Sequence, residues 1–126
     1  MSVTTLVGLL ILALGVAAAR FLWRGFQNGR LGRGWKTVEA LVLVCGICLG
    51  VAAVAHSHYP TPDKRLVGFP FLAAVFERTP SGAWADYVGP ITLPATIGNF
   101  AVGLLLPHLP LATWLWFGLK RRSVIW

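Results

Sequence analysis

Charged side chains are scarce in this sequence. They make up 12% of the 126 residues, whereas 56% of the residues are hydrophobic; a soluble domain usually carries roughly 25% charged residues. Three stretches hold no charge at all: residues 1–19, 40–62 and 87–119. Each is close to, or longer than, the roughly 20 residues that a membrane-spanning helix needs. This balance excludes an ordinary soluble domain and predicts an integral membrane protein.

Acidic residues are rarer still, with 4 against 11 Lys and Arg and a net charge of +7. In a soluble protein this charge would suggest nucleic acid, but the basic residues flank the apolar stretches and no recognition element accompanies them, so nucleic acid is not an expected partner. Most of them follow the first or the third stretch. By the positive-inside rule this predicts the N-terminus outside and the C-terminus in the cytoplasm. The membrane is expected to be an inner (plasma) membrane. The residues expected to set this topology and to contact the headgroups of the lipid bilayer are Arg20, Arg24, Arg30, Arg33, Lys36, Lys120, Arg121 and Arg122.

The sequence therefore predicts an all-α integral membrane protein, a single domain over residues 1–126. We expect three transmembrane helices, at about residues 3–23, 37–56 and 94–119. Arginines follow the first apolar stretch instead of preceding it, which is the reverse of a signal peptide, so this stretch is expected to remain as an anchor. The third helix should kink, because Pro107 and Pro110 lack the amide hydrogens that a helix uses.

Residues 57–93 are expected to form an external loop. Pro60 and Pro62 should end the second helix, and residues 79–82, Thr-Pro-Ser-Gly, match a type I turn. This pattern predicts a short hairpin or an interfacial helix. The segment holds more aromatic residues than a connector requires, which favours contact with lipid headgroups or a partner protein. These residues are Phe69, Phe71, Phe76, Trp84 and Tyr87.

Cysteine is limited to Cys45 and Cys48, a Cys-x-x-Cys pair within the second predicted helix. Membrane thiol oxidoreductases use such pairs, but their chemistry needs a thiolate and a second pair to relay electrons. Counted from His56, the two thiols lie roughly 12 to 16 Å deep in the apolar region. We therefore expect small packing residues here and keep a thiol oxidoreductase as an alternative.

Glycines beside these cysteines form a GxxxG motif at Gly46 and Gly50. At about 100° per residue, Glu39 and Ala53 fall on the same helix face. Small residues allow helix backbones to approach closely in a membrane. This face is predicted to contact another helix.

Polar residues within the apolar stretches are few. Glu39 is expected to form an ion pair with Lys36 at the start of its helix, with proton or cation transfer as the alternative. Asn99 is expected to hydrogen-bond to a neighbouring helix. His108 is expected to hydrogen-bond at the break made by Pro107 and Pro110.

Motifs of known catalytic or binding chemistry are missing. There is no Ser/His/Asp set, Walker loop or Rossmann glycine pattern. His56, His58 and Asp63 make a weak metal signal, and single-ligand binding of haem or pigment by His108 stays open. We therefore predict no catalytic residue, metal or cofactor, and a protein that is not an enzyme.

The leading functional hypothesis is a small accessory or structural subunit that binds other integral membrane subunits, or copies of itself. Its binding surfaces would be the small-residue helix face and the external loop. An alternative is a homo-oligomeric channel, since the predicted topology resembles that of some phage holins. A pore needs a polar helix face, and these helices have only scattered polar residues.

Overall fold

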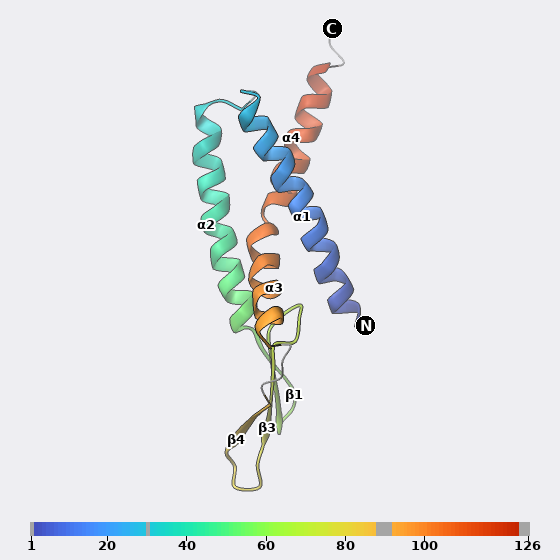
Figure 1. Cartoon of the computed structure of the whole chain (residues 1–126), viewed down its shortest axis with the longest axis vertical. Coiled ribbons are helices and arrows are strands. Elements are labelled where there is room, and N and C mark those ends of the chain that lie inside the picture. The colour runs from blue at the N-terminus through green and yellow to red at the C-terminus, as the bar shows by residue number, and fades with distance from the viewer. Residues whose placement is uncertain (1, 30, 88–91, 124–126) are drawn as a thin grey trace.

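The computed structural model describes residues 2–29, 31–87 and 92–123, without the side chains of Arg33, Asp86, Tyr87 and residues 119–123. Within these residues the chain forms four helices and one four-stranded sheet (Figure 1). The helices are α1 (Val3–Gln27), α2 (Arg33–Ala55), α3 (Thr92–Leu105) and α4 (His108–Ser123). The strands are β1 (Ser57–Thr61), β2 (Lys64–Val67), β3 (Ala74–Arg78) and β4 (Trp84–Tyr87).

Three segments are long and apolar enough to cross a membrane, as predicted. They are α1, residues 34–55 of α2, and residues 92–118, which span α3 and most of α4. Both α1 and α2 extend further into the basic connection than expected. Helix α1 ends where the backbone turns at residues 28 and 29. Asn28 and Gly29 donate backbone hydrogen bonds to Arg24 and Phe26, and Gly29 has φ 65°, a conformation that glycine adopts readily.

The third predicted span is confirmed as a segment that could cross a membrane, residues 92–118, and it is interrupted at the prolines where a kink was predicted. Helix α3 ends at Leu105, and α4 begins at His108. Leu106 still donates to the Val102 carbonyl, but Pro107 has no amide hydrogen to continue the series. Leu109 instead donates to the Leu106 carbonyl at 3.3 Å, and α4 starts from this turn.

The external segment is an antiparallel sheet in the order β1-β2-β3-β4, so the prediction of an all-α chain is wrong and an interfacial helix is excluded. The expected hairpin is present between β3 and β4, where Gly82 donates to the Thr79 carbonyl at 2.8 Å and has φ 85°. The hairpin of β1 and β2 was not expected, because Pro60 lies within β1. Proline is tolerated on this edge strand, since the pairing register shifts between His58 and Thr61.

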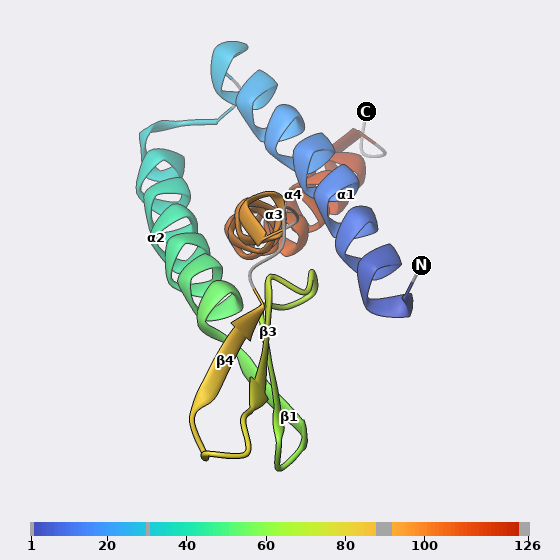
Figure 2. The same ribbon diagram turned by 60° about the horizontal axis from the view of Figure 1, so that its bottom comes forward.

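The sheet extends from one end of the helical bundle, near the N-terminus of α1 (Figure 1). The α1–α2 connection and the end of α4 lie at the opposite end. Helix α3 lies between α1 and α2 and packs against both, while α4 packs against α1 (Figure 2). This central position lets α3 contact both the β2–β3 connection, through Asn99, and His108 of α4, through the Leu104 carbonyl.

Candidate functional site

The small-residue face of α2 lies against α3 of the same chain. A Cβ on Gly46 would lie 2.5 Å from the Leu104 carbonyl oxygen, and a Cβ on Gly50 would lie 2.8 Å from the Phe100 ring. Gly103 of α3 opposes Gly50 so closely that any side chain would meet its backbone. Ala53 lies farther along, where its carbonyl accepts a hydrogen bond from the Phe69 amide. The face is therefore occupied by α3 over the length from Gly46 to Gly50.

The connection between β2 and β3, residues 68–73, turns back into the bundle, and we call it the inserted loop. Asn99 of α3 is completely buried. Its side chain makes two hydrogen bonds to the backbone of the inserted loop. The Asn99 Oδ1 accepts from the Phe71 amide and the Nδ2 donates to the Phe71 carbonyl, both at 2.7 Å. The partner of Asn99 is thus the inserted loop and not a neighbouring helix, contrary to the prediction.

Two residues of the inserted loop fit against helix glycines. Pro70 is buried, and together with Phe71 it touches the space that a side chain on Gly8 of α1 would fill. The Phe71 ring also lies against Gly98 of α3. Phe71, which was expected at an external surface, is therefore held between two membrane helices.

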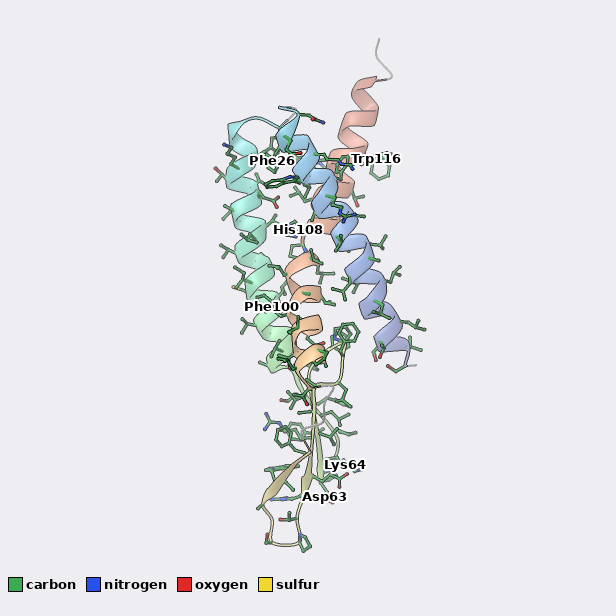
Figure 3. All side chains as sticks on the ribbon, in the orientation of Figure 1. Phe26, Asp63, Lys64, Phe100, His108 and Trp116 are labelled. Atoms are coloured by element: carbon green, nitrogen blue, oxygen red, sulfur yellow. The ribbon has the colours of Figure 1, made fainter. Side chains whose placement is uncertain are left out.

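Glu39 and His108 meet inside the bundle, although they are 69 positions apart in the sequence. The Nε2 of His108 lies 3.1 Å from the Oε1 of Glu39, and its Nδ1 lies 3.1 Å from the Leu104 carbonyl oxygen. The His108 side chain is 6% exposed and the Glu39 side chain 31%. Figure 3 shows His108 within the helical bundle. Glu39 thus pairs with His108 in place of the expected Lys36, and nothing in the sequence signals this contact.

An open cavity of about 430 Å³ lies beside this pair. It is lined by Ala19, Trp23, Phe26, Lys36 and Glu39, from α1 and α2. The second carboxyl oxygen of Glu39, Oε2, is buried and has no hydrogen-bond partner among the side chains and backbone that the structure describes. Glu39, whose carboxyl group is incompletely satisfied, therefore lines a cavity between α1 and α2 together with Lys36.

One face of the external sheet carries arginines stacked on aromatic rings, and we call it the arginine–aromatic face. The guanidinium carbon of Arg65 lies 5.9 Å from the centre of the Tyr59 ring and 5.7 Å from that of Phe76. The guanidinium carbon of Arg78 lies 6.0 Å from the Trp84 ring centre. The strand register explains this, because Arg65 is paired with Phe76 and Arg78 with Trp84. Paired residues of neighbouring strands lie on the same side of a sheet.

The two rings from the edge strands, Tyr59 of β1 and Trp84 of β4, are accessible, since they are 56% and 41% exposed. Their centres lie 6.4 Å apart in an edge-to-face arrangement. Phe76 and Trp84 of this face were predicted from the sequence as contact residues, whereas Tyr59 and the two arginines were not. The alternation along β3, Val75-Phe76-Glu77-Arg78, is the signal that could have located the face.

The opposite face of the sheet carries an ion pair. The Nζ of Lys64 lies 2.9 Å from the Oε1 of Glu77, and both side chains are about half exposed. The hydrogen bond to Glu77, and then its negative charge, raise the pKa of Lys64 above the ordinary lysine value. The pair therefore favours folding at neutral pH and loses this effect as the pH rises through the raised pKa. Its contribution is small, because exposed pairs are screened by water.

The remaining predicted contacts are scattered. Phe69 is 50% exposed, and its ring centre lies 5.9 Å from that of His56. Tyr87 belongs to β4, but its side chain is outside the described part. Cys45 and Cys48 are both exposed on α2, so they do not pack within this bundle as expected. Among the described residues no group of three or more His, Cys, Asp and Glu could hold a metal ion.

Of the basic residues expected to set the topology, Arg20, Arg24 and Lys36 are exposed and lie toward the end of the bundle opposite the sheet. Arg30 and the side chains of Arg33, Lys120, Arg121 and Arg122 fall outside the described part.

Comparison with protein-family models, with curated proteins and with solved structures gives no match. Any function must therefore be inferred from the residues of this chain. Two places stand out by their chemistry: the arginine–aromatic face outside the bundle and the Glu39–His108 pair within it.

Proposed function

We propose that this chain is a non-enzymatic accessory subunit of the inner membrane, which binds the external part of another integral membrane protein through its arginine–aromatic face. The observation that carries the proposal is the stacking of Arg65 and Arg78 on exposed aromatic rings. Arginine and aromatic residues are enriched among the residues that contribute most to protein–protein binding. A connector between two helices has no need of such a surface.

The chemistry of the face indicates what kind of partner it would bind. A guanidinium stacked on a ring keeps its N–H groups at the edge, where they can donate to carboxylates or backbone carbonyls. Arg65 uses part of this capacity on the Ser57 hydroxyl, to which its Nη2 donates at 3.0 Å. The rings supply rigid apolar area at little entropic cost. A partner loop that presents acidic or carbonyl oxygens beside an apolar side chain would fit this face.

Replacing one stacked arginine should weaken this complex. We expect Arg65→Gln to lower the recovery of the companion subunit about tenfold, because loss of a central interface arginine often costs about 1.4 kcal/mol or more. The measurement is the amount of companion that co-purifies after extraction in mild detergent, quantified by native mass spectrometry.

Lys64→Gln is the matched control for this experiment. It removes the same charge from the neighbouring residue, whose side chain lies on the opposite face of the sheet. It should leave the recovery of the companion unchanged. Equal losses in both variants, or a wild-type protein extracted without any companion, would contradict the proposal.

The proposal also includes an orientation, with the sheet outside and the basic end in the cytoplasm. It rests on the positive-inside rule and on the positions of the exposed Arg20, Arg24 and Lys36, which lie at the end away from the sheet. In this orientation the arginine–aromatic face is available to an external partner.

Cysteine labelling tests this orientation. In a background with Cys45→Ala and Cys48→Ala, we expect Ala83→Cys, near the β3–β4 turn, to react with a membrane-impermeant maleimide in intact cells. Asn28→Cys, at the other end of the bundle, should react only after permeabilisation. The reverse pattern would invert the proposed topology. Loss of a thiol–disulfide activity in the background variant itself would favour the thiol oxidoreductase alternative.

A further inference from the structure

We propose that Glu39 is a proton-binding residue within the membrane-spanning bundle. In this proposal it holds one proton against His108 and exchanges it with water at the end where α1 and α2 connect. The inference goes beyond the binding of a partner subunit and does not depend on it.

The hydrogen bonds of His108 require a proton between the two side chains. The Leu104 carbonyl can only accept, so the Nδ1 of His108 must carry a hydrogen. In a neutral ring the Nε2 then has only a lone pair, which accepts from a protonated Oε1 of Glu39. In a charged ring the Nε2 donates to the carboxylate. Either arrangement contains one proton between these atoms, and without it two lone pairs would face each other at 3.1 Å.

The other oxygen of Glu39 indicates where this proton resides. Oε2 is buried and has no donor. A charged carboxylate oxygen without a donor is costly to bury, whereas the carbonyl oxygen of a neutral carboxylic acid costs less. The protonated Glu39 donating to a neutral His108 therefore fits the surroundings better than an ion pair. Neither side chain of the pair is then charged, which lowers the cost of placing them inside a membrane.

Among the described side chains of the helices, the charged residues besides the pair are Arg20, Arg24 and Lys36, toward the connection end of the bundle. Lys36 lies one turn before Glu39 on α2 and lines the same cavity. Arg20 and Arg24 of α1 are exposed. Helix α3 has no titratable side chain, and the next such residue of α4 after His108 is Lys120, near the end of that helix.

Glu39 and Lys36 both line the cavity of about 430 Å³ between α1 and α2. Farther along the chain, α2 and α3 are in backbone contact at Gly46 and Gly50. When the carboxyl releases its proton to water in the cavity mouth, a carboxylate remains, and the ammonium of Lys36 is close enough on the same helix to attract it. The proton can therefore leave and return by the route that Lys36 borders.

Infrared spectroscopy of the full chain in liposomes tests this proposal. At neutral pH we expect the carbonyl band of a protonated carboxylic acid, which shifts when H₂O is replaced by D₂O. Glu39→Gln should abolish the band while conserving the size of the side chain and a donor for His108. Glu77→Gln, which changes an acid of the external sheet, should leave the band in place.

Nitrogen NMR of the wild-type protein gives a second measurement that does not depend on the folding of a variant. His108 is expected to be neutral, with its hydrogen on Nδ1. A charged His108, the absence of a protonated-carboxyl band, or a band that survives Glu39→Gln would overturn the placement of the proton. A band that does not shift in D₂O would show a closed structural hydrogen bond and overturn the proposed exchange.

Discussion

Replacing Asn99 with leucine is expected to destabilise the protein by about 2 to 5 kcal/mol. The side chain is fully buried and satisfies both the amide and the carbonyl of Phe71. Leucine has the same branching at Cγ, with bulkier methyl groups, but cannot make either bond, so two backbone groups lose their partners inside the bundle. Each unsatisfied buried group costs about 1 to 3 kcal/mol. The free energy of unfolding, measured by titration of mixed micelles with a denaturing detergent, should show this loss.

A matched substitution on the same helix separates this effect from a general loss of polarity in α3. The Thr96 hydroxyl donates only to the Thr92 carbonyl, one turn earlier on α3. Thr96→Val should therefore cost less than about 1 kcal/mol. Asn99→Leu should also make residues 68–73 more sensitive to protease, because Asn99 holds the inserted loop in the bundle. Equal stabilities of the two variants would mean that Asn99 does not anchor the loop.

The parts of this structure that could be predicted from the sequence are those that depend on local properties of the chain. The three spanning segments follow from the charge-free stretches, because length and hydropathy alone decide whether a helix can cross a membrane. The break before His108 follows in part from Pro107, since a missing amide hydrogen has a local effect. The turn at residues 79–82 is equally local.

Contacts between distant residues could not be predicted in this way. Asn99 was correctly recognised as a polar residue that needs a partner, but its partner comes from a loop whose return into the bundle has no sequence signature. Glu39 meets His108 only because α2 packs closely against α3 and the break redirects α4. The β1 strand could not be predicted because it contains Pro60, which is incompatible with a central strand but is tolerated at an edge.

The close packing of α2 on α3 leads to the second large expected effect. Gly103 of α3 faces the backbone of Gly50, so a side chain at this position cannot be accommodated by the rotation of a neighbouring side chain. Gly103→Leu should therefore force the two helices apart. We expect a loss of about 3 kcal/mol or more in the free energy of unfolding, at the upper end of what overpacking causes.

Gly118→Leu is the matched control, because a side chain on Gly118 of α4 would meet nothing within 4 Å. It should leave the stability nearly unchanged. Gly103→Leu should also separate Glu39 from His108, since the α2–α3 contact brings them together, and the proton-binding signal of Glu39 should be lost with the stability. The opposite result, a stable monomer that no longer associates with a partner, would mean that Gly103 lies at an interface between proteins. Because the backbone contact between Gly50 and Gly103 lies within one chain, we expect the loss of stability.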